Sequence, residues 1–168
     1  MVINLTPKPL KKQHKVMIEI ERKFLVDKTK WSPKDSGTSI IQGYLSTDKE
    51  RVVRVRIRAD KAWLTIKGKP EGISRIEMEY EIPLSEAGIL MELCLDYPLK
   101  KKRYLEKIGN LVWEIDVFEG CNQGLILAEV ELSDENEEVD LPPWIEKEVS
   151  NDWRYYNSWL AEHPYTTW

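Results

Sequence analysis

The chain has 168 residues, a formal net charge of −4 at pH 7, 42% hydrophobic residues and 32% charged residues. This length suits one domain with its own core, and no run approaches the ~20 apolar residues that a membrane-spanning helix needs. The acidic balance argues against a general nucleic-acid binder, whose affinity would depend on an excess of lysine and arginine. We therefore expect a soluble protein with no membrane segment and no nucleic-acid partner.

Residues 1–16 are basic and polar and lack the continuous apolar core of a secretory signal. We expect them to form a short N-terminal tail before a single domain at residues 17–168, in a cytoplasmic protein. Cys94 and Cys121 lie in dissimilar surroundings and do not suggest the disulfide framework of a small secreted domain. Reduced thiols are therefore expected.

Alternation of apolar and charged residues predicts most of the secondary structure. A strand places successive side chains on opposite faces, so a period of two residues indicates a sheet with one apolar face. Turn residues such as Gly, Asn, Asp and Pro separate the alternating runs. The pattern predicts strands at residues 17–26, 40–45, 51–58, 62–67, 75–82, 100–108, 111–118 and 125–132.

Two segments have helical character. The first begins at Ser85, a residue type that caps helices. Its apolar residues, which we expect to face the core, are Ile89, Leu90, Leu93 and Leu95. The second follows Asn151 and Asp152 as caps, and its apolar residues are Trp153, Tyr156 and Leu160. Together with hairpin-length connections, these elements predict an α+β fold: an eight-stranded antiparallel closed β-barrel with a few short helices outside and at the C-terminus.

The polar faces of the predicted strands carry like charges on neighbouring positions. Solvent-facing strands usually mix their charges, because like neighbours destabilise a sheet. On the first strand Glu19 and Glu21 share a face with Lys23, whereas Arg22 falls on the opposite face. The other acidic pairs are Glu77 with Glu79, Glu114 with Asp116, and Glu129 with Glu131. The basic positions on the corresponding faces are Arg54, Arg56, Arg58, Lys67, Arg75, Lys101 and Arg103.

If these faces line the inside of a barrel, they combine two binding chemistries. Paired carboxylates suit Mg²⁺ or Mn²⁺, which prefer oxygen ligands and commonly bridge to substrate phosphates. Arginine and lysine bind phosphate oxygens, arginine through two parallel hydrogen bonds. The combination is typical of phosphoryl transfer, in which positioning and charge neutralisation supply most of the catalysis.

These motifs resemble the CYTH superfamily, also called triphosphate tunnel metalloenzymes. The defining Glu-x-Glu-x-Lys motif matches residues 19–23. The likeness extends over most of residues 17–160, through residues 42–45, 53–56, 64–68, 75–79, 101–104, 113–116, 128–131, 148–150 and 154–155. The resemblance implies an eight-stranded antiparallel tunnel that binds a linear triphosphate together with a divalent metal ion.

The resemblance also implies a role for each matching residue. The implied catalytic residues are Glu19, Glu21 and Lys23. The implied ligands of Mg²⁺ or Mn²⁺ are Glu19, Glu21, Asp116, Glu129 and Glu131. The implied substrate-binding residues are Lys23, Arg54, Arg56, Lys67, Arg75, Lys101 and Arg103, and the supporting carboxylates are Glu77, Glu79 and Glu114. The roles of Tyr44, Arg58 and Lys147 are left open.

Related tunnels hydrolyse or cyclise different triphosphates, so the fold does not determine the reaction. The short length and residues 42–45 and 148–160 are most similar to the compact bacterial inorganic triphosphatases. We therefore expect metal-dependent hydrolysis of the terminal phosphate of inorganic triphosphate (tripolyphosphate). The alternatives are a class IV adenylate cyclase, a nucleoside or thiamine triphosphatase, and a non-enzymatic polyphosphate-binding module. Either a monomer or a homodimer fits the sequence.

Overall fold

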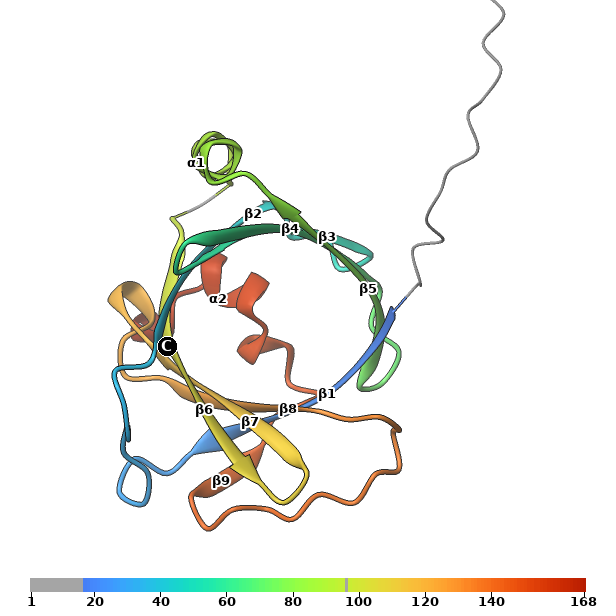
Figure 1. Ribbon diagram of the computed structural model, residues 1–168, viewed down its shortest axis with the longest axis vertical. Coiled ribbons are helices and arrows are strands. Elements are labelled where there is room, and N and C mark those ends of the chain that lie inside the picture. The colour runs from blue at the N-terminus through green and yellow to red at the C-terminus, as the bar shows by residue number, and fades with distance from the viewer. Residues whose placement is uncertain (1–16, 96) are drawn as a thin grey trace, which may run out of the picture.

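In the computed structural model, which describes residues 17–95 and 97–168, strands form a ring around a central space (Figure 1). The strands are β1 (Met17–Val26), β2 (Thr38–Ser46), β3 (Arg51–Arg58), β4 (Lys61–Gly68), β5 (Ser74–Ile82), β6 (Leu99–Ile108), β7 (Leu111–Phe118), β8 (Ile126–Glu131) and β9 (Ile145–Glu148). The helices are α1 (Leu84–Glu92) and α2 (Asn157–Glu162), with 3₁₀ turns η1 (Gly120–Asn122), η2 (Trp153–Tyr155) and η3 (Tyr165–Thr167). The predicted tail at residues 1–16 lies outside the described residues.

Eight of the strands form one sheet that closes into a barrel. Hydrogen-bonded neighbours follow the order β5-β4-β3-β2-β6-β7-β8-β1, and the beginning of β1 pairs back with β5. All of these pairs are antiparallel, including those between strands that are not consecutive in the chain. The predicted α+β fold with a closed eight-stranded antiparallel barrel is confirmed.

The largest apolar core lies on the outer face of β1, β7 and β8. The ring centroids of Phe24 and Trp113 are 5.4 Å apart, and those of Trp113 and Trp144 are also 5.4 Å apart. The segments before β2 and before β9 cover this face with Trp31 and Trp144. The barrel therefore has an unusual arrangement, with much of its apolar core outside the wall and charged residues inside.

This outer core predicts a large effect of one substitution on stability. Trp113 is fully buried, so Trp113→Ala is expected to lower the free energy of unfolding by about 3–5 kcal/mol, through lost burial and the cavity left behind. Trp153→Ala is the matched control, because Trp153 is half-exposed, and should cost about 1 kcal/mol or less. Urea denaturation measures both values. Equal losses for the two variants would contradict this assignment of the core.

The inside of the barrel is apolar at one end. Leu127 and Phe118 lie two positions from Glu129 and Asp116, and hence on the same strand faces, yet they belong to an apolar cluster with Leu160 of α2. α2 contacts β2 and β6 and appears within the ring of strands in Figure 1. This cluster therefore fills one end of the interior, and the charged residues line the remainder.

The prediction for α1 was wrong in its cap and its buried face. The residue at the N-cap is Pro83, and no side chain of the described residues caps the helix, so Ser85 lies inside the first turn. α1 lies outside the barrel wall (Figure 1), where it buries Ala87 against β3 and β4. Of the apolar residues predicted to face the core, Leu90 is partly buried and the exposed ones are Ile89, Leu93 and Leu95. The contact is narrow because the helix packs on a wall and not into a core.

The C-terminal helix is shorter than predicted. Asp152 is a cap, but of the 3₁₀ turn η2, where its carboxylate accepts a hydrogen bond from the Arg154 backbone N–H at 3.2 Å. Tyr156 then adopts an extended backbone, with φ −73° and ψ 135°, so α2 begins one residue later. Of the apolar residues assigned to this helix, Leu160 is fully buried, whereas Trp153 lies at the surface.

Strand β9 was not predicted. It pairs with the end of β1, where Phe24 lies opposite Glu148, and it extends the sheet outside the closed ring. Its sequence has one apolar residue, Ile145, and no alternating pattern. Among residues 17–95 and 97–168, no helix has the length and apolar character needed to cross a bilayer.

Candidate active site

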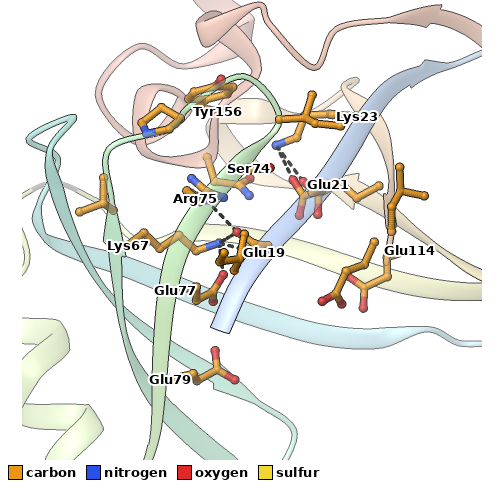
Figure 2. Close-up of a pocket in the computed structure, with 18 of the residues that line it drawn as sticks. Glu19, Glu21, Lys23, Lys67, Ser74, Arg75, Glu77, Glu79, Glu114 and Tyr156 are labelled. Atoms are coloured by element: carbon orange, nitrogen blue, oxygen red, sulfur yellow. Dashed lines mark hydrogen bonds and ion pairs between the residues drawn. The ribbon is translucent and has the colours of Figure 1, made fainter. Parts of the chain in front are cut away.

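The charged part of the barrel interior is a cavity of about 770 Å³. Figure 2 shows part of its wall, where Glu19 and Glu77 lie near Lys67 and Arg75, and Glu21 lies near Lys23. The predicted site residues that line the cavity are Glu19, Glu21, Lys23, Arg54, Arg56, Lys67, Arg75, Glu77, Glu79, Arg103, Glu114, Glu129 and Glu131. The strand alternation thus brings into one cavity residues that are far apart in the sequence.

Two pairs of carboxylates face each other directly across neighbouring strands. Glu21 of β1 lies opposite Glu131 of β8, and Glu114 of β7 lies opposite Glu129 of β8. Like charges in directly opposite positions destabilise a sheet unless a positive charge compensates them. Lys23 Nζ lies 2.8 Å from Glu129 but 3.7 Å from Glu21. Glu21 is therefore the less compensated of these two carboxylates.

The poor compensation of Glu21 changes its proton affinity. Burial, together with the charge of Glu129, raises the pKa of Glu21 to about 7. Burial also raises the pKa of Glu131, and the charge of Glu19 raises it further. A positive charge between Glu21 and Glu131 would favour the ionised form of both carboxylates and relieve their repulsion.

The raised pKa of Glu21 predicts how stability depends on pH. Between its ordinary value of 4.5 and about 7, folded Glu21 keeps a proton that the unfolded chain releases. The free energy of unfolding should therefore fall as pH rises through this window, by roughly 1–3 kcal/mol in EDTA. Urea denaturation across this range measures the slope. Glu21→Gln should flatten it, and an unchanged slope in that variant would contradict the prediction.

Glu19 is held in an ion-pair network on the β4–β5 side of the cavity. Its carboxylate accepts hydrogen bonds from Lys67 Nζ at 2.9 Å and from Arg75 Nε at 2.7 Å, and Lys67 Nζ also lies 2.8 Å from Glu77 (Figure 2). Although burial opposes ionisation, Lys67 and Arg75 help to hold the pKa of Glu19 well below its usual range. Glu19 is therefore a carboxylate that stays ionised and has a defined position.

Arg54 and Arg56 of β3 carry positive charge that is only partly paired. Arg54 is buried; its Nη2 donates to Thr65 Oγ1 at 3.1 Å and lies 3.5 Å from Glu79 and 3.7 Å from Glu77. Among the described residues, the buried Nε of each arginine has no acceptor. Burial and the charge of Arg54 lower the pKa of Arg56 to about 10. An anionic oxygen in the cavity would satisfy these donors and relieve the repulsion.

Lys101 and Asp116 lie inside the barrel, deeper than the residues that line the cavity. Asp116 is fully buried, Lys101 is 2% exposed, and neither is among the described residues that line the cavity. Asp116 accepts hydrogen bonds from Lys101 Nζ and from Arg103 Nε and Nη2, the last two at 2.7 and 2.6 Å. The structure thus groups these three residues, and of them only Arg103 reaches the cavity.

The carboxylates of the cavity fit a hard divalent cation in their donor chemistry, because Mg²⁺ and Mn²⁺ prefer oxygen ligands. Across residues 17–95 and 97–168, no group of three acidic, histidine or cysteine side chains converges closely enough to hold a metal ion unaided. Mg²⁺ usually takes one or two carboxylates and completes its coordination with water and substrate phosphates. The opposed Glu21 and Glu131 provide a partial site of this kind.

The residues whose roles the sequence left open lie in different places. Tyr44 lines the cavity; Gln42 Nε2 donates to its hydroxyl at 2.8 Å, and burial raises the pKa of Tyr44 to about 12. Arg58 also lines the cavity, with its guanidinium 4.9 Å from the centre of the Trp63 ring. Lys147 is exposed on β9 and is not among the described lining residues.

The sequence did not predict that the C-terminal segment reaches the cavity. Ser150 and Tyr156 line it, and Ser150 Oγ accepts a hydrogen bond from the Lys23 backbone N–H at 3.0 Å. Lys23 Nζ lies 5.6 Å from the centre of the Tyr156 ring, within the range of a cation–π contact. Ser150 belongs to a motif of the resemblance, whereas neither charge nor alternation indicates Tyr156.

Known proteins with similar sequences cover nearly the whole chain. A family model described as the CYTH domain matches residues 17–157. An inorganic triphosphatase of Acetivibrio thermocellus is 45% identical over 148 residues, which cover 88% of this chain and 95% of that protein. An inorganic triphosphatase of Nitrosomonas europaea is 36% identical over 149 residues, which cover 86% of this chain and 97% of that protein.

Solved structures agree with the sequence comparison. The crystal structure of an inorganic triphosphatase aligns with a TM-score of 0.62 and 31% identity over 85% of this chain and 97% of that one. A putative adenylate cyclase from Bacillus halodurans, 16% identical with a TM-score of 0.56, shares the fold over 70% of this chain and 81% of that one. Because the family model spans most of the chain and two relatives exceed 30% identity over nearly their full length, the chain belongs to the CYTH domain family.

Proposed function

We propose that the chain is a divalent-cation-dependent triphosphatase that releases the terminal phosphate of inorganic triphosphate. The observation that carries this proposal is the presence, in one cavity, of opposed carboxylates and several rows of arginine and lysine. A linear triphosphate with a bound cation has the complementary pattern of charge. The relatives that are 45% and 36% identical bear the name inorganic triphosphatase, which supports this substrate.

The cationic side chains would bind the phosphates. The proposed contacts are Lys23, Arg54, Arg56, Lys67, Arg75 and Arg103. Their carboxylate partners Glu77, Glu79 and Glu114 hold several of these groups in position, at Lys67, Arg56 and Arg103 respectively. Phosphate oxygens would replace part of these contacts, and fixed cations would then stabilise the charge that develops during transfer.

One or two carboxylates would hold Mg²⁺ or Mn²⁺ together with phosphate oxygens and water, and the candidates are Glu19, Glu21, Glu129 and Glu131. When bound, the cation would neutralise charge on the phosphate oxygens and lower the pKa of a coordinated water. Lys23 contributes at the same place, because its ammonium contacts Glu129 and faces the cavity. The chain's own residues therefore position the triphosphate, neutralise its charge and restrict its exposure to solvent.

Product analysis with several triphosphates tests the proposal. Orthophosphate release should be faster from tripolyphosphate than from thiamine triphosphate or ATP, each assayed separately as the substrate. The release should stop in EDTA. Cyclic AMP and pyrophosphate from ATP would indicate a cyclase instead, whereas ADP and phosphate would indicate a nucleoside triphosphatase. Tight polyphosphate binding without phosphate release at any cation concentration would overturn the proposal in favour of a binding module.

A further inference from the structure

Asp116 occupies a place that differs from that of the cavity carboxylates. It lies opposite Arg103 in the β6–β7 pair and is fully buried. Residues of the apolar cluster that fills one end of the barrel lie next to it, because Phe118 follows two positions later on the same face and Leu127 lies opposite. Asp116 is therefore deeper in the barrel than the described residues that line the cavity.

Both oxygens of Asp116 already have cationic partners. Arg103 donates to Oδ1 through Nε at 2.7 Å and to Oδ2 through Nη2 at 2.6 Å, the bidentate geometry of a strong arginine–carboxylate pair. Lys101 Nζ donates to Oδ2 as well. Lys101 is 2% exposed, so a movement of Asp116 toward the cavity would leave a buried ammonium without its counter-charge.

The other contacts of Arg103 explain what this arrangement achieves. Its Nη1 donates to Glu114, whose side chain is 37% exposed, and its Nη2 also donates to Glu129 at 3.1 Å. A guanidinium has five N–H groups, and after the contacts with described residues one on Arg103 Nη1 remains for a further acceptor. Asp116 thus fixes the buried edge of the Arg103 guanidinium, formed by Nε and Nη2. The Nη1 group faces the cavity and Glu114, the partner that a phosphate oxygen would replace.

We propose that Asp116 is a positioning residue for Arg103, with Lys101 as its counter-ion, and that Asp116 and Lys101 contact neither the substrate nor the cation. The inference rests on the proposed function for the identity of the anion. It replaces the metal-ligand role of Asp116 and the phosphate role of Lys101 that the family resemblance implies. Asp116 acts through Arg103, whose orientation it sets for a phosphate oxygen.

Calorimetric titration of tripolyphosphate in EDTA tests this inference, because neither cation binding nor hydrolysis contributes to it. Asp116→Asn keeps the size of the side chain but removes its charge, and it should weaken binding at least tenfold. A general electrostatic effect would have the opposite sign, since removal of a negative charge favours a polyanion. Wild-type affinity in Asp116→Asn would overturn the inference. Binding by the wild type in EDTA, with no phosphate release once Mg²⁺ or Mn²⁺ is supplied in excess, would instead contradict the proposed function alone.

A double-mutant cycle separates positioning from an independent contact. Arg103→Lys should also weaken binding at least tenfold, and the double variant Asp116→Asn/Arg103→Lys should bind no more weakly than Arg103→Lys alone. If the loss of affinity in the double variant instead equals the product of the two single-variant losses, the inference is overturned. Lys101→Met is a further test that does not depend on the folding of Asp116→Asn. Because Lys101→Met leaves the Asp116–Arg103 ion pair intact, its affinity for tripolyphosphate should stay within about threefold of the wild-type value. A tenfold loss of affinity would contradict the buried role of Lys101.

Discussion

Replacement of Glu21 by glutamine is expected to lower tripolyphosphate turnover by roughly 10²–10³-fold without loss of stability. Glu21 faces Glu131 across β1 and β8, and Lys23 Nζ, at 3.7 Å, compensates it poorly. Glutamine keeps the shape but removes the ionised oxygen that would hold a cation. The same change removes a repulsion, so the free energy of unfolding in EDTA near pH 8 should stay equal or rise.

Phosphate-release kinetics and urea denaturation of the same Glu21→Gln preparation measure both effects. Glu81→Gln is a matched control, because Glu81 lies on β5 in the same alternation as Glu77 and Glu79 but pairs with Lys61 at the surface, 3.3 Å away. The control should keep wild-type turnover. A Glu21→Gln variant with turnover within tenfold of wild type would contradict the proposed role of Glu21.

Replacement of Arg54 by alanine is the second change with a large expected effect, a loss of roughly 10²–10³-fold in kcat/KM for tripolyphosphate. Arg54 is buried in the cavity wall, has a free Nε donor among the described residues and lies 3.5 Å from Glu79. Its removal takes away a charge-assisted phosphate contact and leaves Glu79 less compensated. Both changes disfavour a bound polyanion.

Two further substitutions on β3 sharpen the Arg54 prediction. Arg54→Lys keeps the charge but not the planar pair of donors, so it should recover only part of the lost kcat/KM. Arg51→Ala removes an exposed arginine of the same strand, which pairs with Asp48 at 2.7 Å, and should leave kcat/KM unchanged. Equal losses in Arg54→Ala and Arg51→Ala would show that net charge matters and that the cavity position does not.

The barrel and the faces of its strands could be predicted because a strand alternates its side chains with a strict period of two. That period placed Glu19, Glu21 and Lys23 in the cavity and Arg22 outside, where Arg22 Nη2 pairs with Glu148 at 2.7 Å. The paired carboxylates and the rows of arginine and lysine on that face already indicated phosphoryl transfer, and the resemblance to a family added the linear triphosphate and a role for each residue.

The position of each inward-facing side chain along the barrel axis could not be predicted. Alternation shows which face of a strand a residue is on but not how deep in the barrel it lies. Glu114 and Asp116 share a face of β7, yet Glu114 lines the cavity and Asp116 is fully buried. The stagger of neighbouring strands and the apolar cluster around Leu160 determine that level. Both depend on contacts between segments that are distant in sequence.

The elements outside the barrel were predicted less well for a related reason. α1 touches the wall along a narrow strip around Ala87, so larger apolar residues of the helix, such as Leu84 and Ile89, are left at the surface. β9 has a single apolar residue, Ile145, and forms by pairing with β1. The sequence periodicity of α1 or of β9 alone therefore does not predict where that element packs.

The products formed from tripolyphosphate test the proposed function most directly. With Mg²⁺ or Mn²⁺, phosphorus NMR should show one orthophosphate and one pyrophosphate for each tripolyphosphate consumed, because hydrolysis at the terminal phosphoanhydride cleaves one bond. The same sample in EDTA should leave tripolyphosphate intact, and the Glu21→Gln variant with Mg²⁺ should leave nearly all of it over the time in which the wild type consumes it. Tripolyphosphate that stays intact with the wild-type protein, in Mg²⁺ and equally in Mn²⁺, would contradict the proposed function.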